Sequence, residues 1–186
     1  MRYASNHKQV TRSRLLAATG ALAKKQGFAA TGVDALTAAA GLTSGAFYSH
    51  FGSKKELLEA IIENELNRSL EMFSVDTPAQ FMATVNTYLS ETHVASPESG
   101  CAVPALTSEI ARAGESTQAV FEQGIVRVKE RIFALVQDDA KAWAIISMLV
   151  GAVSIARAMP TPQARAPLLK GVRQQLGEIV GGGMIK

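Results

Sequence analysis

Five small or polar residues share one face of a short predicted helix near the amino terminus: Ser44, Gly45, Ala46, Ser49 and His50. Hydroxyl groups can form hydrogen bonds with base edges or phosphates, and small side chains let a helix sit deep in the major groove of DNA. These residue types at helical spacing therefore indicate a surface that could contact a duplex.

Cys101 is the single cysteine of the chain, which excludes an intrachain disulfide and a zinc site built from several thiolates. Because Pro104 is tolerated in a first turn, the segment 99–106 is predicted to start a helix. A thiol at the positive end of a helix dipole is favoured as thiolate, so one hypothesis makes Cys101 a redox or electrophile sensor. The alternative is a small buried apolar residue, and the lack of Lys or Arg between it and Arg112 argues against strong activation.

Sequence signatures of enzymes are missing from the chain. His7, His50 and His93 do not have the spacing of metal ligands, and there is no Gly-x-Ser-x-Gly, phosphate loop or dinucleotide fingerprint. Carboxylates such as Glu63 and Glu65 are expected on solvated helix faces. We therefore predict no catalytic residues, no metal and no cofactor.

Charge is distributed unevenly along the 186 residues, of which 47% are hydrophobic and 19% charged. This balance excludes an intrinsically disordered chain. Residues 1–55 carry eight Lys or Arg against one acid, Asp34, whereas the remainder carries eleven bases against fifteen acids. The asymmetry suggests that only the first part meets a polyanion. A solvated basic face without a partner is the alternative.

The amino terminus lacks the apolar core of a secretory signal. The longest nearly uncharged apolar run, 142–156, is shorter than the roughly 20 residues of a membrane span. We interpret it as a helix buried on several sides and expect a cytoplasmic protein that does not contact a membrane.

Almost every segment has helical rather than alternating apolar spacing, which predicts an all-α fold of about nine helices. Ser53 with Glu56, and Thr77 before Pro78, are predicted to cap two of them, and Pro167 is expected in the first turn of the last. The expected helices contain 15–23, 33–40, 43–51, 53–73, 77–89, 101–113, 115–136, 138–159 and 163–180.

Two of these helices are short and separated by Gly41-Leu42-Thr43, the spacing of a helix-turn-helix. Gly41 permits the left-handed conformation of a tight turn, and Leu42 should fill the angle between the helices. The second helix is too short to be stable alone, so Phe47 and Phe51 must anchor it from behind.

The segments 27–36 (GFAATGVDAL) and 40–58 (AGLTSGAFYSHFGSKKELL) resemble the DNA-binding domain of TetR-family transcriptional regulators. The resemblance covers roughly residues 9–58. Its most specific part is the string Phe47-Tyr48-x-His50-Phe51-x-Ser53-Lys54. The resemblance implies an amino-terminal helix-turn-helix domain, 1–53, and a larger helical domain for effector binding and dimerisation, 54–186.

By this resemblance, Thr31, Tyr48, His50 and Lys54 contact phosphates, and Thr43, Ser44, Gly45, Ala46 and Ser49 lie at or near base edges. The family often has a second hydroxyl residue where this chain has Gly32, and a lysine where it has Ser44. Alternatives are plain packing for Tyr48 and a solvated charge for Lys54. A cation at a helix start opposes the dipole, which favours a polyanion partner for Lys54. The basic residues Lys8, Arg12 and Arg14 are expected near the phosphate backbone, or on a solvated face.

One short recognition helix buries too little surface for specific affinity, so two copies on a twofold axis are expected to bind two half-sites. By resemblance, the last two helices form a four-helix bundle across the twofold; an intramolecular core is the alternative. The predicted dimer residues are Ala144, Met148, Gly151, Ala152, Leu169, Val172 and Leu176.

The resemblance also implies a small-molecule effector that changes the separation of the two DNA-binding heads. An aromatic and methionine stripe could line its pocket, although such a stripe also suits plain core. The candidates are Phe73, Phe81, Met82, Tyr88, Cys101, Leu106, Phe121, Trp143 and Met148.

These observations predict a homodimeric transcriptional regulator of double-stranded DNA, a repressor released from a palindromic operator by an unidentified small molecule. The alternative function is a helical ligand-binding or redox- or electrophile-sensing module, built around Cys101, that does not read an operator.

Overall fold

The computed structural model describes the backbone of residues 2–181 and the side chains of residues 8–181. Within this range the chain forms ten helices and no strand, so the all-α prediction is confirmed. The helix not anticipated is α6. The helices are α1 (Arg2–Gln26), α2 (Val33–Ala39), α3 (Ser44–Tyr48), α4 (Lys54–Met72), α5 (Pro78–Tyr88), α6 (Glu91–Ala95), α7 (Val103–Ile110), α8 (Glu115–Val136), α9 (Asp139–Ala158) and α10 (Pro162–Gly181).

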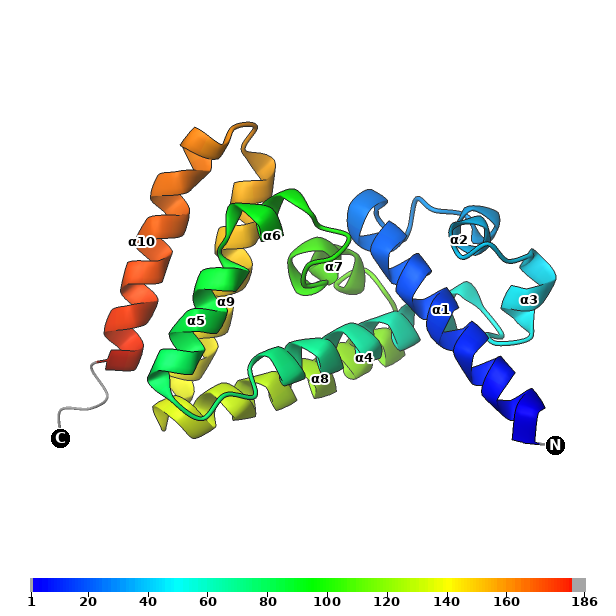
Figure 1. The fold of residues 1–186 in the computed structure, drawn as a ribbon, viewed down its shortest axis with the longest axis horizontal. Coiled ribbons are helices and arrows are strands. Elements are labelled where there is room, and N and C mark those ends of the chain that lie inside the picture. Colours follow the sequence, from blue (N-terminus) through cyan, green and yellow to red (C-terminus); the bar gives the residue numbers. More distant parts are fainter. Residues whose placement is uncertain (1, 182–186) are drawn as a thin grey trace.

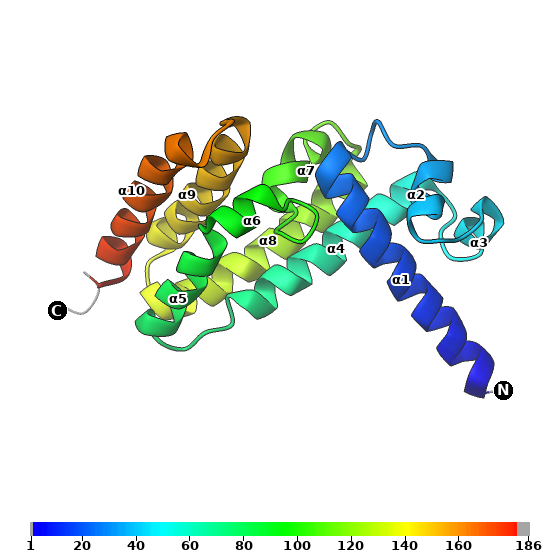
Figure 2. The same ribbon diagram turned by 45° about the horizontal axis from the view of Figure 1, so that its top comes forward.

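The ten described helices form an elongated molecule, with the start of α1 and the end of α10 at opposite ends (Figure 1). Helices α1, α2 and α3 make up one end, which we call the head. Helices α5, α9 and α10 make up the other end, and α4 and α8 lie side by side between the two (Figures 1 and 2). Because α4 packs against both α1 and α8, it connects the head to the rest of the chain.

Glycines and capping side chains lie at the helix ends that the sequence predicts. Gly27 and Gly41 have φ values of 84° and 65°, the left-handed region that glycine adopts without strain. The Ser53 side chain accepts a hydrogen bond from the Glu56 backbone N–H, but the Glu56 carboxylate accepts from Gly52 rather than from Ser53. Thr77 forms a complete capping box at the start of α5.

Three local predictions are wrong. Helix α7 begins at Val103, so Cys101 lies outside its first turn. Ala102, at the N-cap position, forms no side-chain cap hydrogen bond that would mark this boundary in the sequence. Pro167 lies inside α10, which starts at Pro162. Glu65 is not on a solvated face but only 5% exposed, because it pairs with a buried lysine of α1.

Helix α9 alone among the described helices is long and apolar enough by composition to span a membrane. Seven of its residues, including Ile145, Leu149 and Val153, are nevertheless buried in the core of this chain. It packs against α7, α8 and α10. Burial of one face of α9 therefore explains its apolar composition. Trp143 and Ile155 remain exposed on a different face of the helix.

Candidate nucleic-acid interface and inner cavity

Helix α3 is anchored by two aromatic side chains and presents its other face to solvent. Phe47 and Phe51 are 0% and 1% exposed, and their ring centroids lie 6.0 Å apart. Tyr48 packs edge-on against Phe47 but is 61% exposed. Gly45 and Ser49 are also exposed. The helix is thus held from behind and open in front, as the sequence predicts.

The hydroxyl groups around α3 are already in local hydrogen bonds. The Thr43 side chain accepts from the Ala46 backbone N–H and caps the helix. The Ser44 hydroxyl donates to Asp34 Oδ1 over 2.6 Å, and the Ser49 hydroxyl donates to the Ala46 carbonyl over 2.7 Å. Each hydroxyl oxygen keeps acceptor capacity for a further partner.

Cations from α1 border the same surface. Lys8, Gln9 and Arg12 line a groove with Ser49 and His50, and the Arg12 guanidinium lies 5.0 Å from the centre of the Phe51 ring. Burial lowers the pKa of His50, and the positive charges of Lys8 and Arg12 lower it further. The neutral imidazole is therefore favoured in this basic groove.

Two residues with an expected phosphate contact form hydrogen bonds within the chain: Thr31 is buried, and Lys54 is half-buried. Thr31 is 6% exposed, and its hydroxyl donates to the Gly27 carbonyl over 2.6 Å. The Lys54 ammonium donates to the Ala29 carbonyl over 3.0 Å and lies 4.9 Å from the centre of the Phe28 ring. Both side chains hold the loop between α1 and α2, and the face of α3 does not include them.

A small apolar cavity lies inside the larger part of the chain. Its volume is about 20 Å³, enough for one water molecule and too small for a larger effector without expansion. Helices α8 and α9 provide much of its wall, and no charged side chain borders it among the described residues. The lining is Ser69, Phe73, Tyr88, Cys101, Val103, Ile125, Val128, Ile132, Ile146, Leu149 and Val150.

Three predicted pocket residues, Phe73, Tyr88 and Cys101, are brought together in this lining. Phe81 packs against Phe73 at a centroid distance of 6.0 Å without reaching the cavity, and Trp143 is 38% exposed on the outer face of α9. The other predicted pocket residues, also outside the lining, are Met82, Leu106, Phe121 and Met148. Sequence reasoning favoured aromatic and methionine side chains, whereas the α8 wall is an aliphatic stripe at helical spacing, Ile125, Val128 and Ile132.

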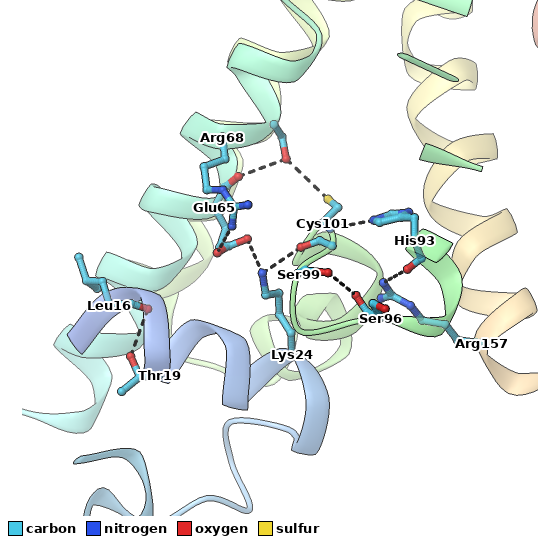
Figure 3. A network of polar contacts seen from close by, with 12 residues as sticks. Leu16, Thr19, Lys24, Glu65, Arg68, His93, Ser96, Ser99, Cys101 and Arg157 are labelled. Atoms are coloured by element: carbon cyan, nitrogen blue, oxygen red, sulfur yellow. Dashed lines mark hydrogen bonds and ion pairs between the residues drawn. The ribbon is translucent and has the colours of Figure 1, made fainter. Parts of the chain in front are cut away.

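A polar network surrounds Cys101 (Figure 3). The Cys101 sulfur lies 3.6 Å from the Ser69 hydroxyl, and the Cys101 backbone N–H donates to His93 Nε2 over 3.0 Å. The other ring nitrogen of His93 is 2.5 Å from the Tyr88 carbonyl, which makes it the N–H donor. His93 is therefore the neutral Nδ1–H tautomer, and burial lowers its pKa.

The predicted dimer residues divide into two groups. Ala152, Leu169 and Leu176 are buried within this chain. Ala144, Met148, Gly151 and Val172 remain exposed or half-buried on α9 and α10. A Cβ added at Gly151 would meet nothing within 4 Å, so open space faces that position.

Metal binding receives no support from the part of the chain whose side chains are described. No three His, Cys, Asp or Glu side chains gather there in a group that could hold an ion.

Comparisons with known proteins agree with this geometry. Residues 15–61 match the family described as bacterial regulatory proteins, tetR family. No match was found among curated proteins. The fold is similar to that of a TetR transcriptional regulator from Chloroflexus aurantiacus J-10-FL, with 24% identity, a TM-score of 0.78, and coverage of 95% of this chain and 96% of the other.

Two further solved structures have the same fold. The first is a TetR-family transcriptional regulator from Cytophaga hutchinsonii, with 21% identity, a TM-score of 0.77, and coverage of 97% of this chain and 98% of the other. The second is the reduced form of E. coli NemR, with 19% identity, a TM-score of 0.72, and coverage of 91% and 97%.

Proposed function

We propose that the chain is a TetR-family transcriptional regulator, which binds a palindromic operator as a homodimer and is released by a small apolar molecule. A regulator of this family binds DNA and is not an enzyme. The observation that carries the proposal is the exposed face of α3, backed by the buried rings of Phe47 and Phe51.

The DNA contacts divide by chemistry. Ser44, Gly45, Ala46 and Ser49 are proposed to approach base edges, with the exposed Tyr48 hydroxyl directed to a phosphate. Lys8, Arg12 and Arg14 of α1 supply charge for the backbone of the duplex. Thr31 and Lys54 are proposed to act indirectly, because their side chains hold the loop after α1.

Two heads are needed for two half-sites, so the proposal includes a dimer through α9 and α10. Its support is the apolar surface that these helices leave open in one chain, with Trp143 38% and Ile155 51% exposed. In this proposal residues 1–53 read DNA and residues 54–186 dimerise and bind the effector.

The cavity suggests the class of effector. Its wall is aliphatic and aromatic, with hydroxyl and thiol groups only at Ser69, Tyr88 and Cys101. An uncharged, mainly apolar molecule suits such a wall, because an ion would be left without a partner. Such a molecule shifts the protein away from its DNA-bound conformation only if it binds the conformation with the expanded cavity more tightly.

The test is recovery of the genomic fragments that the protein binds, followed by a gel shift on the recovered duplexes. We expect saturable binding whose affinity falls steeply with salt, as phosphate contacts require. Binding that is absent or shows no preferred sequence would instead favour the ligand-sensing module without operator reading. The genes beside the recovered sites then indicate the chemistry of the effector.

A further inference from the structure

The carboxyl-terminal end of α1 and the loop that follows it are each held by the segment that contains α7. The Lys24 ammonium donates to the Gly100 carbonyl over 2.9 Å. The Glu109 carboxylate accepts from the backbone N–H groups of Phe28 and Ala29, over 3.0 and 2.6 Å. We call these contacts of Lys24 and Glu109 the α1 clamp. They join residues more than 70 positions apart and bring the head and the α7 segment together.

Lys24 is an unusual anchor because it is only 5% exposed. Its ammonium also pairs with Glu65 of α4 over 2.9 Å, and the second oxygen of Glu65 pairs with Arg68 (Figure 3). A buried charge is strongly destabilising when its partners leave. A movement that takes the Gly100 carbonyl or Glu65 away from Lys24 would therefore leave a buried charge short of partners, which favours keeping these contacts together.

The same segment forms part of the cavity wall. Cys101 and Val103 line the cavity, directly after Gly100. Cys101 and Ser69 also line an open groove of about 220 Å³ together with Arg68 and Gly100. The Cys101 and Ser69 side chains thus stand between the groove and the cavity. Expansion of the cavity on this side must move Cys101, and with it the neighbouring Gly100 carbonyl.

We propose that the α1 clamp transmits the state of the cavity to the head. When the wall at Cys101 moves outward, the Gly100 carbonyl leaves Lys24, and the head is no longer held in one orientation relative to α4. The proposal rests on the proposed function, since it assumes that the head binds DNA. Coupling between two sites is reciprocal, so DNA bound to the head must also stabilise the wall at Cys101.

This reciprocity can be measured because Cys101 is the single thiol of the chain. The rate of alkylation by N-ethylmaleimide is followed by mass spectrometry, with and without a saturating concentration of a duplex that the protein retards in a gel. The variants are Lys24→Met and Glu109→Ala. The control is Lys25→Met, which removes the exposed neighbouring cation.

We expect DNA to slow alkylation of the wild type and of Lys25→Met by about fivefold or more, within the usual range of coupling between sites. Alkylation of Lys24→Met and Glu109→Ala should be faster without DNA and nearly unchanged by it. Glu109→Ala keeps the buried Lys24–Glu65 pair and so serves if Lys24→Met does not fold.

Two results would overturn the α1 clamp. One is equal slowing by DNA in all four proteins, which indicates direct shielding; the other is no slowing in a wild type that the gel shows to be bound. If the wild type retards no duplex, the gel shift itself rejects the proposed function, and the clamp is rejected with it.

Discussion

The hydroxyl of Ser44 in α3 donates a 2.6 Å hydrogen bond to the carboxylate of Asp34 in α2. Asp34 is the one acid among the first 55 residues, and it lies in the first turn of α2. The bond ties the two helices of the helix-turn-helix together. It also places a negative charge beside the face that we propose to meet DNA.

Asp34→Asn should therefore strengthen binding to every duplex. It removes repulsion from phosphate while keeping a side-chain oxygen as acceptor, and the gain should be at most about fivefold, or ~1 kcal/mol, for one charge near solvent. The gain in affinity should shrink as the salt concentration is raised.

The same substitution removes an acid at a helix start, which should lower the free energy of unfolding by ~0.3–1 kcal/mol. Fluorescence anisotropy at two salt concentrations measures the first effect and thermal unfolding the second. Glu115→Gln, in the first turn of α8, is the control; an equal gain there would contradict a local effect.

Ser49→Ala should change the base preference of DNA binding, whereas Tyr48→Phe should change the overall affinity. Loss of the Ser49 hydroxyl should change the preferred base at one position by ~1–3 kcal/mol. Loss of the Tyr48 hydroxyl should weaken all sequences alike, by ~0.5–1.5 kcal/mol for one hydrogen bond. Selection of bound sequences from a random duplex library separates the two. Identical uniform losses in both variants would reject the assignment of Ser49 to base edges.

Ile155→Glu should break the dimer and leave the fold of each chain intact. Ile155 is 51% exposed on α9, so a charge there costs little in one chain but would be buried without a partner in a dimer. Light scattering should report a monomer, and DNA affinity should fall with it. Val126→Glu, at an apolar position of α8 that is 37% exposed, should remain a dimer. A dimeric Ile155→Glu variant would place the interface elsewhere.

Acid should destabilise the chain through His93. Burial is the main cause of its lowered pKa, and the charges of Arg157 and Lys24 add to it, although the bond to the Tyr88 carbonyl acts in the opposite direction. The unfolded chain therefore binds more protons than the folded one as pH falls below the ordinary value of 6.5. The contribution of His93 to stability is retained above that pH and lost below it.

Thermal unfolding between pH 5 and 8, a range set by the ordinary pKa of about 6.5 for histidine, measures this effect. The wild type should lose stability towards the acid end more steeply than His93→Gln. Parallel pH profiles of the two proteins would show that His93 does not titrate on unfolding.

Alkylation of Cys101 should weaken DNA binding. The thiol is 8% exposed and stands between the groove and the cavity, so an added group must displace the wall beside Gly100. After treatment with N-ethylmaleimide, the wild type should lose about fivefold or more in affinity, the scale of allosteric coupling. Cys101→Ser should not respond. An equal loss in both proteins, or none in a fully alkylated wild type, would reject a sensing role for this thiol.

The sequence by itself determined nine of the ten described helices, the helix-turn-helix and its anchors. Gly41, Thr43 and Ser53 act through neighbours in the chain, and Phe47 and Phe51 follow a helical period, so their roles depend on local geometry. Family resemblance added the DNA-binding function. The boundary of α7 was missed because Cys101 and Ala102 precede it without a cap that the sequence could reveal.

Tertiary structure alone decided the rest. The partner of Lys24 is Glu65, and the partners of Glu109 are the amides of Phe28 and Ala29, all on other helices or loops. The spacing of apolar residues along a helix indicates which side chains share a face, but it does not indicate which other helix packs against that face. For the same reason, the aliphatic wall that α8 gives the cavity could not be predicted from the aromatic residues of the sequence. Contacts between distant segments depend on how whole helices pack, and that packing is a property of the complete chain.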